Sequence, residues 1–242
     1  MQLVFDFPVV PRYALDNFVV CSGNRTAFEF ARRLADPAAG ESVLYVYGPP
    51  GSGKTHLLMA IGREMCSDEA EAPCFSCGAI AAGAAPGSAE VVSPLVERLL
   101  DAPVLLVDDI DQLPDSRPLR EDVWHLFNEF YQSGRRIVVT GAVPPRELAS
   151  VDDHLISRLL WGLVARMDVS DDDSRRLILK KLADDRQIVL PDEVIAYLLI
   201  HTRRDAHSLI NSFVKLVKHS LATGRKISIR LSREALGGGE VV

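Results

Sequence analysis

The sequence predicts an α/β fold in which a parallel sheet is sandwiched by helices, followed by a small C-terminal helical domain. Short apolar runs alternate with amphipathic segments over most of the chain. Runs that are apolar throughout indicate strands buried on both faces, and their alternation with helices is typical of a parallel sheet. After Asp168 the strand-like runs largely give way to helical spacing. We therefore expect a core at residues 13–169 and a helical domain at residues 170–242.

Each element follows from its hydrophobic pattern. Residues 43–47 are expected to form the first buried strand, and residues 55–65 the helix after it, with Leu57, Leu58 and Ile61 on one face. Further strands are expected at residues 104–107, 137–140 and 163–169, with a weak strand near Cys74. Further helices are expected at residues 94–100, 119–131, 171–184, 192–201 and 206–221, and a last short strand at residues 227–231.

The composition is that of a globular protein, since 48% of the 242 residues are hydrophobic and 25% are charged. The formal net charge of −6 argues against binding to nucleic acid by overall charge, so a DNA contact would need a local basic patch. The sequence has no apolar run of the roughly 18 residues that a membrane helix needs, and its first residues lack the pattern of a signal peptide. We expect a cytoplasmic protein with no membrane contact.

Four cysteines are too few for a disulfide scaffold in a chain of this length. Cys74 and Cys77 have the CxxC spacing of a zinc site, but no second pair of ligands accompanies them. Cys21 and Cys66 stand alone. We therefore favour buried or incidental thiols over a metal or redox centre.

A phosphate-binding loop is the most specific motif in the chain. Residues 48–55, Gly-Pro-Pro-Gly-Ser-Gly-Lys-Thr, satisfy the pattern GxxxxGK[ST] and lie between an expected strand and an expected helix. Glycines allow backbone N–H groups to surround phosphates, and the helix start adds its positive pole. The lysine reaches the β- and γ-phosphates, and the threonine hydroxyl holds Mg²⁺. The residues expected to bind ATP or ADP are Gly48, Pro49, Gly51, Ser52, Gly53, Lys54 and Thr55.

Two carboxylates follow the strand expected at residues 104–107. Asp108 stands at the end of this strand, where a carboxylate beside a phosphate-binding loop can hold Mg²⁺ through its water shell. Asp109 would orient or deprotonate the water molecule that attacks the γ-phosphate. The alternative is that both aspartates belong to a solvated acidic loop, because Asp111 and Asp115 follow. This alternative carries more weight for Asp109 than for Asp108.

These motifs and several further segments resemble the DnaA branch of the AAA+ ATPases over nearly the whole chain. The matching segments are the loop with its helix, the strand with its two aspartates, and residues 13–20, 157–163, 204–211 and 224–229. Taken singly only the loop is specific, but the order and spacing of all six are strongly specific. The resemblance implies an AAA+ core with a helical lid, adenine beside Phe18 and Val19, and a nucleotide sensor at Arg204.

The resemblance also implies that one arginine reaches into the nucleotide site of a neighbouring protein. Arg158 takes this position here, and an arginine placed on a γ-phosphate in trans raises the rate by about 10³ to 10⁵. The alternative is a surface arginine paired with Asp152 or Asp153. Arg204 likewise could be one member of a basic face of the last helices, which would be solvated or would meet DNA or an acidic partner.

The chain resembles in particular the Hda family, the short branch without the flanking domains of DnaA, which switches DnaA off. Members of that family dock on the DNA-loaded sliding clamp, the β subunit of DNA polymerase, through an N-terminal peptide that begins Gln-Leu. Residues 1–12 take that place here, and an extended peptide with several apolar side chains suits an apolar groove. The clamp-binding residues implied are Gln2, Leu3, Phe5 and Phe7. A short strand packed on the chain's own sheet is the alternative.

One departure from the family concerns hydrolysis. Ala142 stands where DnaA has an aspartate that helps to position the attacking water, and Thr140 is a partial substitute. We therefore expect nucleotide binding with weak or no intrinsic ATPase activity. The resemblance implies a negative regulator of replication initiation that binds adenine nucleotide and the clamp, reaches DNA only through the clamp, and promotes hydrolysis of DnaA-bound ATP. The alternatives are a DnaA-like adaptor without effect on hydrolysis and a helicase-loader-like ATPase. The sequence also allows a homo-oligomer.

Overall fold

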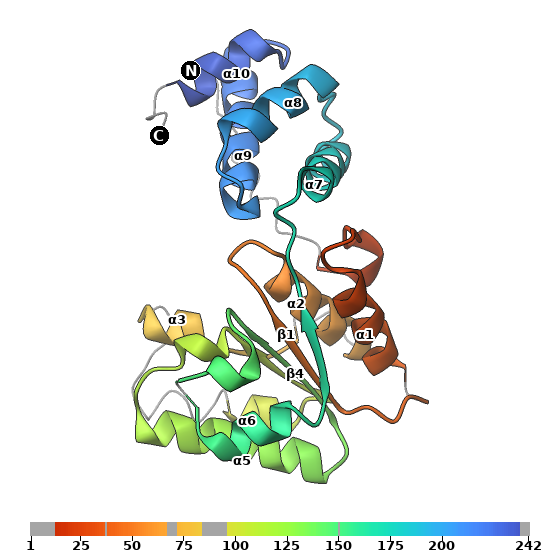
Figure 1. The fold of residues 1–242 in the computed structure, drawn as a ribbon, viewed down its shortest axis with the longest axis vertical. Helices are drawn as coiled ribbons and strands as arrows, with labels where there is room; N and C mark the ends of the chain where they lie inside the picture. Colours follow the sequence, from red (N-terminus) through yellow and green to blue (C-terminus); the bar gives the residue numbers. More distant parts are fainter. Residues whose placement is uncertain (1–12, 37, 67–71, 84–95, 150, 238–242) are drawn as a thin grey trace.

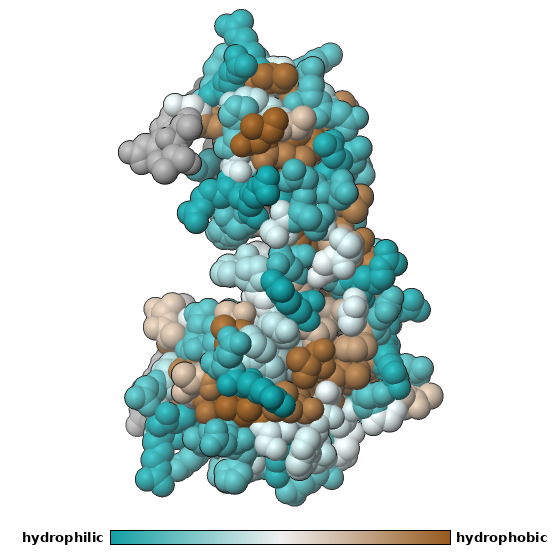
Figure 2. All heavy atoms as spheres, in the orientation of Figure 1, coloured by the Kyte–Doolittle hydropathy of each residue, from teal (hydrophilic) through white to brown (hydrophobic). Residues whose placement is uncertain are grey.

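A computed structural model describes residues 13–36, 38–66, 72–83, 96–149 and 151–237 of the chain. It has two parts, a core built on a sheet and a helical domain that lies above the core in Figure 1. In the space-filling view the two parts meet at a narrow waist (Figure 2). The chain passes from the last strand of the core directly into the first helix of the helical domain (Figure 1).

In the described part of the chain, five parallel strands form one sheet in the order β2-β3-β4-β1-β5. They are β1 (Val43–Tyr47), β2 (Cys74–Ser76), β3 (Val104–Asp108), β4 (Arg136–Gly141) and β5 (Leu163–Arg166). Strand β4 pairs with both β1 and β3, so the C-terminal ends of these three strands lie side by side. The parallel sheet expected from the sequence is confirmed.

Helices cover both faces of the sheet because the strands are apolar on both sides. Val43 and Tyr45 of β1 face one layer while Leu44 and Val46 face the other, since successive side chains of a strand point to opposite faces. The first layer contains α3 (Cys77–Ala81), α5 (Arg117–Gln132) and α6 (Asp153–Leu159), and the second contains α1 (Arg25–Ala35) and α2 (Lys54–Met65). In sheets covered in this way, ligands bind at the carboxyl ends of the strands.

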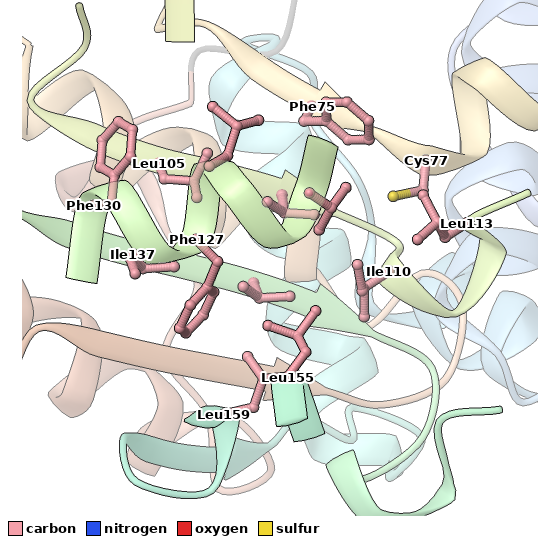
Figure 3. Close-up of a cluster of buried hydrophobic side chains, with 14 of the residues drawn as sticks. Phe75, Cys77, Leu105, Ile110, Leu113, Phe127, Phe130, Ile137, Leu155 and Leu159 are labelled. Carbon is pink, nitrogen blue, oxygen red and sulfur yellow. The ribbon is translucent and has the colours of Figure 1, made fainter. Parts of the chain in front are cut away.

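The larger hydrophobic cluster of the core lies between the sheet and α5 (Figure 3). Phe127 and Phe130 project from the inner face of α5 toward Leu105 of β3 and Ile137 of β4 (Figure 3). Both rings are almost fully buried, and burial of one phenylalanine side chain contributes about 1.5–3 kcal/mol. This packing anchors α5, and half-buried residues beside this face provide the contacts of Arg158.

Two helices of the core, α1 and α3, were not expected from the sequence. The buried face of α1 carries Ala27, Ala31 and Leu34, and alanine adds little to a hydrophobic pattern although it favours a helix. Helix α3 has only five residues and begins directly after β2, where the Ser76 side chain accepts a hydrogen bond from Ala79 N. Helix α3 is therefore too short to stand out. Helix α1 did carry a signal, since Phe28 and Phe30 accompany its buried residues and pack against the same cluster.

The helical domain consists of α7 (Asp172–Asp185), α8 (Asp192–His201), α9 (Ala206–Thr223) and α10 (Ile229–Leu236). The first three agree with the helices expected from the sequence, and their apolar faces form a separate hydrophobic cluster. No helix in the described residues is long and apolar enough to cross a membrane.

The strand expected at residues 227–231 was wrong, because α10 begins at Ile229. Ser228 is extended, but its side chain accepts a hydrogen bond from Leu231 N and so caps a helix. Leu231 is buried in the cluster of the helical domain, and Ala235 and Leu236 pack against the same cluster. This spacing suits a helix, whereas the alternation that suggested a strand covers only five residues.

None of the four cysteines, all within the described residues, forms a disulfide bond, and Cys21 and Cys77 are buried. Burial raises the pKa of the Cys77 thiol, with nearby Cys74 adding to the rise, so the thiol stays protonated at neutral pH. Among the described residues, no group of three or more His, Cys, Asp and Glu side chains could hold a metal ion.

Candidate nucleotide-binding site

The phosphate-binding loop, residues 48–55, joins β1 to α2. Gly51 and Gly53 have positive φ angles of 77° and 96°, which glycine adopts without steric cost. A Cβ atom at Gly48 would lie 1.9 Å from the carbonyl oxygen of Met167, so a side chain there would displace the backbone. Gly53 immediately precedes α2, and the first N–H groups of a helix have no partner within it. The loop thus ends at a helix start that is suited to bind an anion.

Two buried polar groups of the loop are suited to a phosphate ligand. The ammonium group of Lys54, which is 7% exposed, donates hydrogen bonds to the carbonyl oxygens of Gly48 and Pro49 over 2.8 and 3.2 Å. Burial lowers the pKa of Lys54, and nearby carboxylates oppose this shift. The Ser52 hydroxyl is buried and has no hydrogen-bond partner among the described residues. A phosphate group would offer oxygen atoms to both.

Thr55 and Asp108 meet where a magnesium ion would be held. The Thr55 hydroxyl donates a hydrogen bond to Asp108 Oδ2 over 2.8 Å, and Asp108 is the buried last residue of β3. Magnesium in nucleotide sites commonly takes one or two carboxylates from the protein and its other ligands from phosphates and water. The donors present, one hydroxyl and one carboxylate, therefore fit Mg²⁺ that arrives with a nucleotide.

Thr140 orients both aspartates from the end of β4. Its hydroxyl donates to Asp108 Oδ1 over 2.5 Å and accepts from the Asp109 N–H over 3.0 Å. Asp109 has φ 53° and ψ 52°, in the left-handed region, which costs energy in residues other than glycine and is found often at functional sites. Burial raises the pKa of the Asp109 carboxyl, and Asp108 adds to the rise. A raised pKa makes the carboxylate a better proton acceptor.

A cleft of about 600 Å³ opens between the loop, the end of β4 and the helical domain. Its walls include Pro49 and Ser52 from the loop, Ala142 from the segment after β4, and Arg204 from the helical domain. A volume of this size falls within the range of ligand-binding pockets, about 300–1,000 Å³. The structure therefore brings Arg204 and the loop together at one cleft.

The start of α9 brings the helical domain against the loop. A Cβ atom at Gly51 would lie 2.6 Å from His207 N, so the two backbones approach closely. Asp205 caps α9 by accepting a hydrogen bond from Ser208 N over 2.7 Å. Arg204, the residue before this cap, is exposed and lines the cleft. A movement of the helical domain would therefore move Arg204 relative to the loop.

A second arginine, Arg175 of α7, holds this segment in place and was not anticipated from the sequence. Its side chain is fully buried. The guanidinium donates to the carbonyl oxygens of Leu199 and Arg203 over 3.3 and 3.1 Å, and to Thr202 Oγ1 over 3.1 Å. Because Arg203 directly precedes Arg204, these hydrogen bonds fix the backbone from which Arg204 extends.

The Phe18 ring lies beside the loop, near its helix. The nearest ring atom of Phe18 would be 3.6 Å from a Cβ atom at Gly53. The Phe18 ring stacks on Phe28 with centroids 5.6 Å apart and meets the His56 ring edge-on at 5.4 Å. Val19 follows and is half-buried. Neither Phe18 nor Val19 lines the cleft described above. The cleft therefore includes residues of the phosphate-binding loop but not the residues expected to contact adenine.

Arg158 of α6 lies away from the cleft, against half-buried residues of α5. Its Nη1 atom donates a hydrogen bond to Asn128 Oδ1. The guanidinium carbon lies 4.8 Å from the ring centroid of Trp124 and 5.4 Å from that of Tyr131, distances at which a cation and an aromatic ring attract. Trp161, 65% exposed, lies nearby with its ring 6.1 Å from that of Tyr131. Arg158 thus contacts aromatic residues rather than the surface aspartates considered above.

The four residues expected to bind the clamp, Gln2, Leu3, Phe5 and Phe7, lie outside the described residues. Their role rests on the sequence.

The fold and the loop define a P-loop protein of the α/β class, and comparison with known proteins narrows the class. Residues 9–166 match the family model described as the bacterial DnaA ATPase domain, and residues 172–236 match the model of the Hda lid domain. Because the first match covers more than half of the chain, the chain belongs to the bacterial DnaA ATPase-domain family of AAA+ proteins. Its helical domain is a lid of the Hda type.

Solved structures agree with this assignment. Domain III of the replication initiation protein DnaA from Thermotoga maritima is 27% identical, with a TM-score of 0.79, and the match covers 96% of this chain and 98% of that one. AMPPCP-bound DnaA from Aquifex aeolicus is 28% identical with a TM-score of 0.71, and the match covers 86% of this chain and 65% of that one. The RuvB branch migration motor from T. maritima, 16% identical over 93% of this chain and 72% of that one, shares the fold with a TM-score of 0.61.

Proposed function

We propose that this chain is a negative regulator of DNA replication initiation that binds adenine nucleotide with Mg²⁺, docks on the sliding clamp and promotes hydrolysis of ATP bound to DnaA. One observation carries the proposal: Lys54, Thr55, Asp108 and the unpartnered Ser52 hydroxyl converge at the start of α2. This arrangement supports nucleotide binding. The matches to the DnaA ATPase domain and the Hda lid support a role in the DnaA system.

The residues of the loop would hold the phosphates and Arg204 would contact them from the helical domain. Lys54 would exchange its carbonyl partners for phosphate oxygens, and Thr55 and Asp108 would hold the metal ion. Mg²⁺ supplies positive charge next to the β- and γ-phosphates. Phe18 and Val19 would lie against adenine. The AMPPCP-bound DnaA of A. aeolicus, which shares this fold, supports an adenine nucleotide as the ligand.

Arg158 would act on a nucleotide held by another protein. It does not line the chain's own cleft, and the residues beside it expose apolar surface, with Leu160 38% and Trp161 65% exposed. Exposed apolar side chains that adjoin one another favour a contact with a partner protein. In such a contact Arg158 would leave Asn128 and meet the γ-phosphate of ATP on DnaA, where a guanidinium stabilises the charge of the transition state.

The chain would be organised in three parts. Residues 1–12 would be a clamp-binding peptide, residues 13–169 the nucleotide-binding core and residues 170–242 the lid. The clamp assignment rests on Gln2, Leu3, Phe5 and Phe7 and is supported by the match of the helical domain to the Hda lid model. Through the clamp, the chain would be brought close to DnaA on DNA without a DNA site of its own.

A DnaA-ATP turnover assay tests the proposal. The assay measures hydrolysis of ATP on DnaA with and without this chain and DNA-loaded clamp. We expect the chain to raise turnover, a chain without residues 1–8 to lose clamp binding and this stimulation, and Arg158→Ala to lose stimulation by about 10³-fold.

Arg117→Ala is the matched control, because Arg117 lies on the same side of the core, on α5, and is 86% exposed. It should leave stimulation unchanged. If the unaltered chain bound DnaA and clamp but left turnover unchanged, the chain would be an adaptor. If it hydrolysed ATP strongly without DnaA, a helicase-loader-like ATPase would be the better account.

A further inference from the structure

The C-terminal end of β4 lies at the centre of the phosphate site. Strand β4 pairs with β1 on one side and with β3 on the other, so its end stands between the loop and Asp108. The Gly48 N–H donates a hydrogen bond to the carbonyl oxygen of Gly141, the last residue of β4, over 3.2 Å. The next residue, Ala142, lines the cleft without a polar side chain. Any polar side chain that acts beside Ala142 must therefore come from another element.

Asp111 supplies such a group from the turn after β3. It belongs to the short 3-10 helix η2 (Ile110–Gln112), which follows Asp109. Asp111 Oδ1 accepts a hydrogen bond from the Ala142 N–H over 2.7 Å. A Cβ atom at Gly141 would lie 3.3 Å from the same oxygen. The absence of a side chain at Gly141 thus leaves room for the carboxylate beside the end of the strand.

Thr140, a polar residue near this end of β4, already uses its hydroxyl group in two hydrogen bonds. The hydroxyl donates to Asp108 and accepts from the Asp109 N–H. A carboxylate offers about four acceptor sites, and the hydrogen bond from Ala142 occupies one of those of Asp111. Asp111 is only half-buried, so its remaining acceptor sites are open to a water molecule.

Backbone contacts place Asp111 beside the site. Its carboxylate bonds the backbone of Ala142, and Ala142 lines the cleft. The residue before Ala142, Gly141, accepts a hydrogen bond from Gly48 of the phosphate-binding loop. The Asp111 carboxylate therefore stands next to the loop that would hold the phosphates.

We propose that Asp111 is the positioning residue on the γ-phosphate side of the nucleotide site, where Ala142 provides no polar side chain. The inference rests on the proposed nucleotide binding. Asp111 holds a water molecule next to the terminal phosphate. In hydrolysis the oxygen of this water forms a bond to the γ-phosphorus while the bond from that phosphorus to the bridging oxygen breaks. ADP and inorganic phosphate form, and the inorganic phosphate carries the proton released from the water.

Asp111→Asn tests the role, because an asparagine oxygen can still accept the Ala142 N–H while the charge is gone. Calorimetric titration of the full chain with Mg²⁺ compares AMPPCP, which carries a γ-phosphate, with ADP. Less repulsion of the γ-phosphate should raise the affinity for AMPPCP about three- to tenfold, with the affinity for ADP unchanged. The control, Asp115→Asn, makes the same change at a side chain that is 91% exposed and should alter neither affinity.

A relocated carboxylate provides the second test. Asp111→Ala alone should shift the ratio of the affinities for AMPPCP and ADP. The double variant Asp111→Ala with Ala142→Asp returns one carboxylate to the end of β4, so it should restore the original ratio. An unchanged ratio in Asp111→Asn, with both ligands still bound, would overturn this inference alone. If the unaltered chain bound neither ligand, nucleotide binding itself would be overturned and the inference with it.

Discussion

The Thr55 hydroxyl donates a hydrogen bond to Asp108 Oδ2 over 2.8 Å, which joins the first turn of α2 to the end of β3. Both groups are oxygen donors of the kind that Mg²⁺ prefers. Thr55 and Asp108 would hold the metal ion, which would supply positive charge beside the phosphates. The strand ends and the first turn of α2 therefore preorganise the site.

Thr140→Val removes the hydroxyl that orients both aspartates while keeping the shape of the side chain. It leaves Asp108 Oδ1 and the Asp109 N–H without this partner in a buried place, so we expect a loss of about 1–3 kcal/mol in the free energy of unfolding. The affinity for Mg²⁺ with nucleotide should fall about 10- to 100-fold. Urea unfolding and a Mg²⁺ titration measure the two effects. Thr140→Ser keeps the hydroxyl and should behave almost as the unaltered chain; equal stability of the valine variant would contradict the account.

Arg175→Ala should destabilise the helical domain by about 3 kcal/mol, because it leaves a cavity and unpaired carbonyl groups in the interior. The buried guanidinium bonds the carbonyl oxygens of Leu199 and Arg203. Urea unfolding followed by circular dichroism measures the change. The neighbouring Arg176→Ala is the control and should cost less than about 0.5 kcal/mol. Similar losses in the two variants would show that Arg175 has no special part in the fold.

Asp205→Ala should remove a pH-dependent contribution of about 1 kcal/mol to stability, the usual size for a helix cap. The hydrogen bond from Ser208 N lowers the pKa of the Asp205 carboxyl below its ordinary value. A carboxylate with a lowered pKa in the folded state stabilises the fold above its unfolded pKa of about 3.9, and this stabilisation is lost as the pH falls through the folded value.

The difference between the unaltered chain and Asp205→Ala in urea unfolding should therefore be full at pH 7 and decline at pH values below about 4. Asp205→Asn retains an acceptor for the Ser208 N–H but cannot titrate, so it should keep most of the stability at pH 7. A constant difference from pH 7 down to pH 3 would show that the carboxylate charge does not contribute.

The sheet and the phosphate-binding loop could be predicted because their signals are local. Strands β1, β3 and β4 contain continuous apolar runs, and the loop pattern fixes glycine, lysine and threonine at set spacings. Asp108 followed from its place after a strand. The match to the DnaA ATPase domain agrees with the family inferred from these segments.

Other features depend on contacts between distant segments and had no such signal. The hydrogen bond between Ala142 and Asp111 joins residues 31 positions apart, and it requires the turn at Asp109, whose φ of 53° no pattern announces. Arg175 did have a signal: with Leu179 and Ala183 it forms the buried stripe of α7 at intervals of four residues. Because an arginine in a helix is usually solvated, this spacing did not lead to the prediction that Arg175 is buried.

The central claim is that the loop binds adenine nucleotide, and calorimetric titration of the purified chain with ADP and with ATP in the presence of Mg²⁺ tests it most directly. Lys54→Ala removes the buried ammonium group, so affinity should fall about 10²-fold or more. Lys180→Ala, at a half-exposed lysine of the helical domain, should bind as the unaltered chain does. Measurable binding that depends on Lys54 is the predicted result; no binding by the unaltered chain, or equal binding by Lys54→Ala, would contradict the account.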